Sequence, residues 1–249
     1  MPLMQDLAGD LAAAVGGAEI FAVYQPQVSL ETGSIVAAEA LCRWRHPRLG
    51  DIEPGTIIEV AERTGAIHAL GRRMLDECLD TLAEWRGMGR GWAVTLNVSP
   101  VQFEDESFAG HVAAAFERRG HGPGSLVLEL SHDLLPSADD RVTLSQLAML
   151  RDAGVEISLG GYGAGSTSPE RVARLPLSEV KIPGLLVRAV EPDARAALRH
   201  EVEVAHAHGL RVVAEGIETL SHLDIAVALG CDRAQGFLIR HPDSEIVLP

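Results

Sequence analysis

The sequence predicts an α/β barrel of the TIM-like (β/α)8 type, with an antiparallel first strand. Eight short runs with β-strand character recur along the 249 residues, and helical patterns with apolar residues three and four positions apart separate most of them. Such alternation is typical of a parallel sheet covered by helices, and single barrels commonly contain about 250 residues. An open doubly wound sheet is the alternative, but no Gly-x-Gly-x-x-Gly joins a strand to a helix.

The elements follow in order from this pattern. A short amphipathic helix is expected within residues 1–18, followed by strands at 21–28 and 35–41. Because residues 29–34 are too few for a crossover helix, these two strands should be antiparallel. Further strands are expected at 92–98, 126–130, 155–159, 179–182, 210–214 and 233–239. The helices between them are expected at 67–85, 108–118, 140–152, 193–208 and 220–228.

The composition excludes some classes of function. Lys and Arg number 21 against 35 Asp and Glu, which gives a net charge of −14 and argues against non-specific nucleic-acid binding. The cysteines Cys42, Cys78 and Cys231 form no Cys-x-x-Cys pair, which indicates a reducing compartment. No apolar run approaches the roughly 20 residues that span a bilayer, and no signal peptide is evident. We therefore expect a cytoplasmic protein without membrane insertion.

Polar side chains stand at the ends of the predicted strands. Asn97, Glu129, Lys181, Glu215 and Gln235 each end or follow a different apolar run. In a barrel the carboxyl ends of the strands form the active face, so these residues should converge there. One such residue is equally compatible with a solvated strand end, but five together indicate a binding or catalytic site.

Six blocks in compatible order give the sequence its resemblance to a known family. The chain resembles the EAL domain family of cyclic-di-GMP phosphodiesterases and receptors over residues 21–242, and we expect a single domain of this type over 1–249. The blocks are Tyr24-Gln25-Pro26, Glu39-Ala40-Leu41 continued by Cys42-Arg43-Trp44-Arg45-His46-Pro47, Asn97-Val98-Ser99-Pro100-Val101-Gln102, Lys181-Ile182, Ala214-Glu215-Gly216-Ile217-Glu218-Thr219, and Gln235-Gly236-Phe237.

The resemblance implies hydrolysis assisted by two divalent cations, Mg²⁺ or Mn²⁺, which prefer oxygen ligands. It assigns the first metal to Glu39, Asn97, Glu129 and the first acid of a D-D-F-G-T-G block. That acid, the next Asp and Glu215 would hold the second metal. Lys181 would lie near the attacking water and the phosphate. The remaining ligand-binding residues by resemblance are Gln25 near a guanine edge, Leu41 of the Glu39-Ala40-Leu41 triplet, Arg43 on a phosphate, and Gln235 ordering the pocket.

The chain departs from the family pattern where the metals would bind. The D-D-F-G-T-G block reads Gly160-Gly161-Tyr162-Gly163-Ala164-Gly165, so both aspartates are replaced by glycine. The first metal keeps three of four ligands, and the second keeps only Glu215. Three further differences from the family are His132 in place of Glu, Pro183 in place of Asp, and Ser166 in place of Tyr.

These changes all affect one functional unit, the expected metal site. Gln25, Arg43 and the Glu39-Ala40-Leu41 strand, in contrast, retain the residues of the family pattern. We therefore predict a non-catalytic cyclic-di-GMP-binding receptor whose metal, if any, binds weakly. A slow metal-dependent phosphodiesterase and a protein-interaction domain that no longer binds nucleotide are the alternatives. By resemblance, the partners would include a second copy of the chain or a neighbouring sensory or GGDEF domain.

Overall fold

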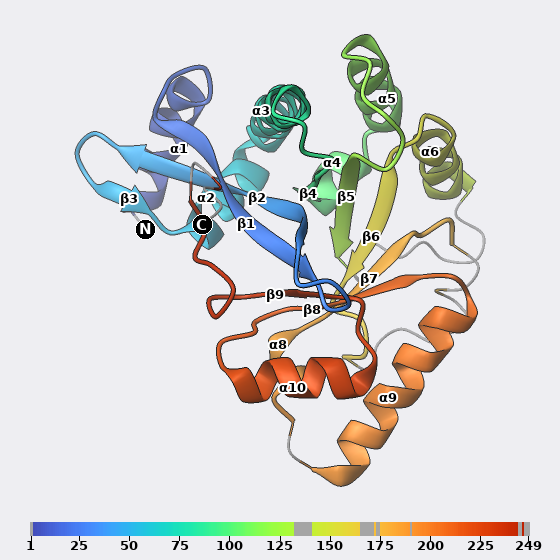
Figure 1. The fold of residues 1–249 in the computed structure, drawn as a ribbon. Helices are drawn as coiled ribbons and strands as arrows, with labels where there is room; N and C mark the ends of the chain where they lie inside the picture. The colour runs from blue at the N-terminus through green and yellow to red at the C-terminus, as the bar shows by residue number, and fades with distance from the viewer. Residues whose placement is uncertain are drawn as a thin grey trace.

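The computed structural model describes residues 2–131, 141–164, 172, 175–189, 191–243 and 246, with side chains from Leu7 onwards. In these residues eight strands close into a barrel, because β1 pairs with β2 as well as with β9 (Figure 1). The ring runs β1-β9-β8-β7-β6-β5-β4-β2. Its strands are β1 (Ile20–Ser29), β2 (Ile35–His46), β4 (Ala93–Val98), β5 (Leu126–Ser131), β6 (Glu156–Gly160), β7 (Glu179–Ile182), β8 (Arg211–Ala214) and β9 (Arg233–Gln235).

The first strand is the irregular one, as the sequence predicts. β1 is antiparallel to both of its neighbours, β2 and β9, while the other neighbours in the ring are parallel. The hairpin closes through a bond from the Ser29 amide to the Ser34 carbonyl, and Gly33 adopts the positive φ of 69° that its turn needs. The antiparallel register sets Gln25 opposite Glu39, so both side chains enter the barrel at the same height.

Helices lie on the outside of the barrel, as Figure 1 shows. They are α1 (Pro2–Ala14), α2 (Pro54–Thr64), α3 (Ile67–Gly87), α4 (Pro100–Phe103), α5 (Phe108–Arg118), α6 (Arg141–Asp152), α8 (Gly184–Val187), α9 (Pro192–Ala207) and α10 (Leu220–Leu229). The sequence prediction did not include α2, α4, α8 or the short strand β3 (Gly50–Ile52), which pairs with β2 outside the ring. Pro54 at the start of α2 and Gly65 at its left-handed C-cap are ordinary helix signals that mark this helix.

The expected last strand, 233–239, is wrong in its second half. β9 ends at Gln235, and the chain turns at Gly236, where the Ile239 amide donates to the Gly236 carbonyl. A side chain could not be accommodated at this turn, since a β-carbon on Gly236 would lie 2.2 Å from the Ile217 carbonyl oxygen. The backbone of β9 and that of the segment after β8 are therefore held in direct contact.

Apolar side chains pack around the outside of the barrel. Inside it, small apolar side chains fill one end and polar side chains fill the other. Trp44 and Trp85 are buried in the larger outer cluster, and all three cysteines are free. Inside the barrel, Ala37, Ala93 and Val127 pack together near the amino ends of their strands. This arrangement leaves room for longer polar side chains at the carboxyl ends.

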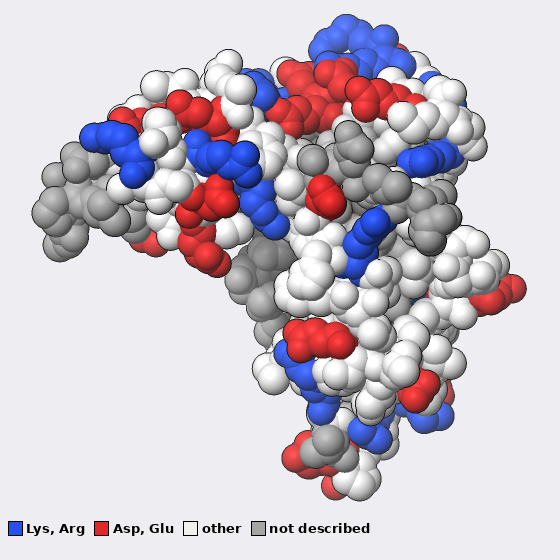
Figure 2. Space-filling view, turned by 60° about the vertical axis from the view of Figure 1, so that its left-hand side comes forward, with Lys and Arg blue, Asp and Glu red and all other residues white. Residues whose placement is uncertain are grey.

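The surface carries both signs of charge. On the face in Figure 2, acidic and basic side chains are interspersed and no continuous basic tract is visible. Within the described residues, no helix has the combined length and apolar character required to cross a membrane. The sequence differences at His132 and Ser166, and the matching Gly165, lie outside the described residues.

Candidate functional site at the carboxyl ends of the strands

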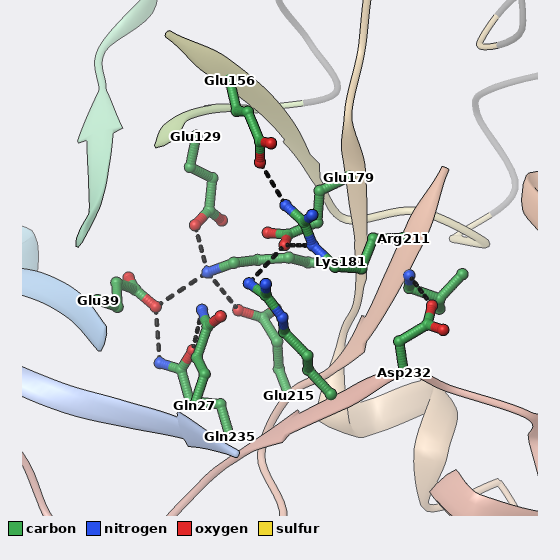
Figure 3. Close-up of polar contacts among 12 residues, drawn as sticks. Gln27, Glu39, Glu129, Glu156, Glu179, Lys181, Arg211, Glu215, Asp232 and Gln235 are labelled. Carbon is green, nitrogen blue, oxygen red and sulfur yellow. Dashed lines mark hydrogen bonds and ion pairs between the residues drawn. The ribbon is translucent and has the colours of Figure 1, made fainter. Parts of the chain in front are cut away.

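The polar residues expected at the strand ends do converge. Glu39, Asn97, Glu129 and Lys181 come from β2, β4, β5 and β7, Glu215 follows β8 directly, and Gln235 ends β9 (Figure 3). Parallel pairing sets Asn97 beside Glu129. The barrel therefore gathers, within one cluster, residues that lie up to 196 positions apart in the sequence.

Lys181 is at the centre of this cluster, and it is the only lysine in the sequence. Its side chain is completely buried, and its Nζ atom lies 2.5 Å from Glu129 Oε2, 3.0 Å from Glu39 Oε2 and 3.4 Å from Glu215 Oε1. Figure 3 shows the ammonium group between the three carboxylates. One positive charge thus faces three acidic groups in a region with little water.

Glu39 has the most complete set of partners among the three acids. Its Oε1 accepts a hydrogen bond from Asn97 Nδ2 at 2.6 Å, and its Oε2 accepts one from Gln235 Nε2 at 2.7 Å. The Gln235 amide also donates to Gln25 Oε1, and its own oxygen accepts from Gln27 Nε2. This chain of amides fixes the orientation of Glu39 from two sides.

The three acids differ in acidity because their surroundings differ. Burial raises the pKa of Glu129 to about 8, reinforced by Glu39 and Glu215 and opposed by Lys181. Burial likewise raises the pKa of Glu215. Burial works against ionisation of Glu39 too, but Lys181, Asn97 and Gln235 outweigh it and hold its pKa below the ordinary value. Glu39 is therefore the anion that the cluster stabilises best.

Lys181 responds in the opposite sense. Burial alone would lower the pKa of this ammonium group, but the three carboxylates outweigh that effect and hold it well above its ordinary value. The lysine therefore remains a cation throughout the range in which its neighbours titrate. It neutralises part of the acidic charge permanently, without any metal.

The three carboxylates provide part of the ligand set that one divalent cation needs. Oxygen atoms of Glu39, Glu129 and Glu215 all lie within 4.8 Å of one another, as carboxylate ligands of a hard cation do. Lys181 Nζ stands among the same atoms, so a cation bound there would have to displace it or share the acids with it. Among the described residues, Glu39, Glu129 and Glu215 are the one group of acids placed to hold a cation together.

Gly160 ends β6 at this cluster. A β-carbon built on it would lie 2.7 Å from Glu129 Oε1, so a side chain at this position would point into the carboxylates. Gly161 differs, since its φ of 76° is one that L-residues rarely adopt. A side chain at position 160 would therefore enter the cluster, whereas the backbone at position 161 favours glycine.

Arg43 and Leu41 lie apart from the ion cluster. Both line an apolar cavity of about 330 Å³, which Asn97 joins to the cluster. Arg43 is half-buried and donates to the Cys42 carbonyl at 2.9 Å, and it has no carboxylate partner among the described residues. The other walls of the apolar cavity come from α2 and α3, and include Pro54, Gly55, Ile58, Ile67, Leu70, Gly71 and Met74. Burial raises the pKa of the neighbouring Cys42 thiol to about 12, which makes this cysteine an unreactive packing residue.

Sequence reasoning missed two features of the barrel interior. Gln27 is fully buried and supports Gln235, and the alternation Gln25-Pro26-Gln27 was the available signal. At the amino ends of the strands, Arg211 joins Glu156 and Glu179, and Arg233 also contacts Glu179. Each of these four residues is the first of its strand. The opposite charges at the starts of neighbouring strands were therefore a sequence signal for these ion pairs at the amino end of the barrel.

The fold and the site together define a class of protein: a TIM-like barrel with an antiparallel first strand and a carboxylate, amide and lysine cluster at its carboxyl end. Within that class, the chain belongs to the EAL domain family, whose model matches residues 8–242.

Two curated relatives match over most of this chain. It is 34% identical over 236 residues to the bifunctional diguanylate cyclase/cyclic di-GMP phosphodiesterase MucR of Pseudomonas aeruginosa, covering 94% of this chain and 34% of MucR. It is 30% identical to the oxygen sensor protein DosP of Escherichia coli, covering 95% of this chain and 30% of DosP. The chain thus spans about a third of the length of these relatives.

A solved structure extends the likeness to three dimensions. The PaMucR phosphodiesterase in its c-di-GMP complex superposes with a TM-score of 0.87 at 33% sequence identity. The match covers 96% of this chain and 97% of that one. The similarity therefore includes the whole barrel rather than a shared motif.

Proposed function

We propose that this chain is a single EAL-type barrel domain that binds cyclic-di-GMP as a receptor and does not hydrolyse it at a useful rate. One observation carries the proposal. Lys181 Nζ contacts all three remaining acids, while the neighbouring position that would supply a further ligand is Gly160. The cluster is thus balanced by an internal cation and lacks the ligands for a two-metal site.

Binding would use groups that do not depend on a metal. Arg43 offers a guanidinium fork that is free of carboxylate partners within the described residues, and such a fork suits the paired oxygens of a phosphate. The apolar cavity of about 330 Å³ beside it has the size and the apolar lining of an ordinary ligand pocket. Gln25, held by Gln235, would stay oriented toward the ligand at the barrel mouth.

A metal, where bound, would supply a Lewis acid and an activated water. Glu39, Glu129 and Glu215 would hold it. In the metal-free domain, the residues of the cluster have other roles. Glu39 positions the Asn97 amide at the edge of the apolar cavity, and Lys181 limits the repulsion between the acids and a ligand phosphate.

Calorimetry with cyclic-di-GMP, with Mg²⁺ and then with EDTA, tests the proposal. We expect binding under both conditions and no accumulation of the linear dinucleotide. Because Lys181 is the only lysine, selective lysine labelling gives a single Nζ resonance that reports whether Mg²⁺ enters the cluster. Absence of binding in both buffers refutes the receptor function, and turnover at a rate ordinary for the family refutes its non-catalytic character.

A slow phosphodiesterase is the second candidate, and the three converging carboxylates favour it. Loss of the acid shared by two metals should raise the barrier by several kcal/mol, about 10³-fold or more in rate. Product formation that depends on Mn²⁺ and disappears in Glu215→Gln would support this candidate.

The remaining proposals concern partners and location. A cytoplasmic domain that signals to a neighbouring sensory or GGDEF domain, or to a second copy of the chain, would suit a receptor. A third candidate, a protein-interaction domain without nucleotide, requires a partner whose binding is unchanged by both Arg43→Ala and saturating cyclic-di-GMP. Co-purification with Arg43→Ala as the matched variant separates these cases.

A further inference from the structure

A cavity lies at the amino end of the barrel, on the side away from the acid cluster. It has a volume of about 420 Å³ and is bounded by the β1–β2 hairpin, by α10 and by the starts of β8 and β9. Arg211 and Arg233, the first residues of these two strands, line it. Within the described residues this base cavity shares no wall with the apolar cavity, so it is separate from the site at the carboxyl end.

The two arginines of the base cavity are paired unequally. Arg211 donates to Glu156 Oε2 at 2.5 Å and to Glu179 Oε2 at 2.8 Å, and Figure 3 draws both contacts. Arg233 reaches the same oxygen of Glu179 at 3.4 Å, and this is its one side-chain contact within the described residues. Most N–H groups of Arg233 are therefore left to meet a ligand in the cavity.

The acidity of the two guanidinium groups shows the same imbalance. Burial alone would lower the pKa of Arg211, but Glu179 and Glu156 outweigh it and hold the pKa above its ordinary value. Burial and the neighbouring Arg211 hold the pKa of Arg233 below its ordinary value, although Glu179, Glu156 and Asp232 oppose them. The side chain of Arg233, only 16% exposed, is thus a cation that its neighbours compensate incompletely.

The acids that line the cavity do not complete the pairing. Asp232 Oδ2 accepts from His206 Nε2 at 3.0 Å and from the Val212 amide at 2.7 Å. Glu31 is exposed on the hairpin and forms no ion pair within the described residues. Arg233 therefore lies beside acids that are bound elsewhere or directed to solvent.

Ion pairs at this end of a barrel commonly serve stability alone, but the pairing here is incomplete. Glu179 is fully buried, and both arginines contact its Oε2 while its Oε1 has no hydrogen-bond partner within the described residues. A network built only for stability would use both oxygens of such a carboxylate. The structure thus retains a donor group beside a cavity large enough to receive a ligand.

We propose that the base cavity binds a small oxyanion, a phosphate or a carboxylate, through the guanidinium of Arg233 with Arg211 beside it. A guanidinium fork binds two oxygens of either group at once. Val36 and Val227 add apolar wall, so the anionic group of a larger molecule would also fit. This site does not depend on cyclic-di-GMP and is independent of the proposed function.

Thermal unfolding in rising concentrations of inorganic phosphate tests the site, with sodium chloride of equal ionic strength as the reference. A ligand that binds only the folded protein raises the unfolding temperature in a saturable way, and calorimetry gives its affinity. A parallel titration with acetate distinguishes a carboxylate from a phosphate ligand.

Two variants address the cavity in different ways. Arg233→Lys keeps the charge but removes the fork. Val227→Glu adds an acid to a wall residue that is 55% exposed, so the fold should tolerate it, and Val227→Gln is its uncharged control. Arg119→Gln, which removes an arginine paired with Asp76 and Asp80 away from the cavity, is the control for the loss of an arginine.

We expect saturable binding of phosphate or acetate by the wild type and by both controls, and about tenfold weaker binding by Arg233→Lys and Val227→Glu. A wild type that responds to neither anion beyond the chloride reference overturns the inference. Binding that persists unchanged in both variants also overturns it, as does binding that Arg43→Ala alone removes, because the anion then lies at the carboxyl end. None of these results bears on cyclic-di-GMP binding, so the proposed function is tested separately.

Discussion

Gly160 of β6 and Glu129 of β5 lie so close that a β-carbon on the glycine would be 2.7 Å from Glu129 Oε1. The backbone of Gly160 is not in the left-handed region, so its conformation is compatible with a side chain. Only the flexible end of Glu129 would have to move. Position 160 is therefore where one substitution changes the charge of the cluster most directly.

Gly160→Asp should destabilise the metal-free protein and make its stability depend on Mg²⁺. At a pH above about 8, where Glu129 is ionised, a fourth acid beside it adds like-charge repulsion of about 2–4 kcal/mol at an effective dielectric near 20. Urea unfolding in EDTA and in Mg²⁺ measures the effect, and Gly160→Asn is the uncharged control of the same shape. Equal stabilisation of Asp and Asn variants by Mg²⁺ would contradict it.

The double variant Gly160→Asp, Gly161→Asp should gain hydrolysis of cyclic-di-GMP. Restored carboxylates would complete a two-metal ligand set, and the rate with Mn²⁺ should rise by about 10³-fold or more. The second change costs about 1 kcal/mol of stability, because Gly161 has a φ of 76°. Chromatography of the linear product measures the gain. No gain in a folded, metal-binding double variant would locate the defect elsewhere.

Lys181→Met should be strongly destabilising. Removal of the single cation leaves three buried acids without their partner, and breaking a buried ion pair costs about 3–5 kcal/mol. Urea unfolding gives the value. Arg63→Met, which removes an exposed pair with Glu59, serves as control and should cost less than about 1 kcal/mol. Similar losses in both variants would show that Lys181 is not what neutralises the cluster.

Stability of the metal-free protein should fall as the pH rises toward 8. Burial raises the pKa of Glu129 from 4.5 to about 8, so the folded state retains a proton that the unfolded state releases. The contribution of this group is fully present below pH 4.5 and is lost as the pH rises through about 8, by at most about 1.4 kcal/mol per pH unit. Urea unfolding of wild type and Glu129→Gln from pH 5 to 9 should show a steeper slope in the wild type, and the raised pKa of Glu215 should leave a smaller slope of the same sign in the variant. Parallel curves would contradict it.

Arg43→Ala should weaken cyclic-di-GMP binding about tenfold while leaving stability within about 0.5 kcal/mol. Its only hydrogen bond within the described residues goes to the Cys42 carbonyl, so little native structure depends on its charge. Calorimetry and thermal unfolding measure the two effects. Arg45→Ala, which removes an exposed arginine paired with Asp51, is the control. Unchanged affinity in Arg43→Ala would remove the phosphate role.

The strand ends show which features of the protein the local sequence pattern predicts. Apolar runs of fixed length place Asn97, Glu129 and Lys181 at the carboxyl ends of strands, and in a closed barrel such ends must converge. The short 29–34 connection likewise determines that β1 and β2 are antiparallel. These features depend on residues adjacent in sequence, which is why the sequence alone predicted the fold class and which polar side chains converge at the carboxyl ends of the strands.

Tertiary structure decided what those residues do to one another. No local pattern shows that Lys181 Nζ would lie between Glu39, Glu129 and Glu215, because each contact joins strands far apart in the chain. A small cavity between α3 and α5, of about 90 Å³, also arises only when the helices pack. Acidity, charge balance and cavity shape depend on distances through space, and burial sets their magnitude. Sequence therefore identified the members of the cluster, and packing determined its charge state.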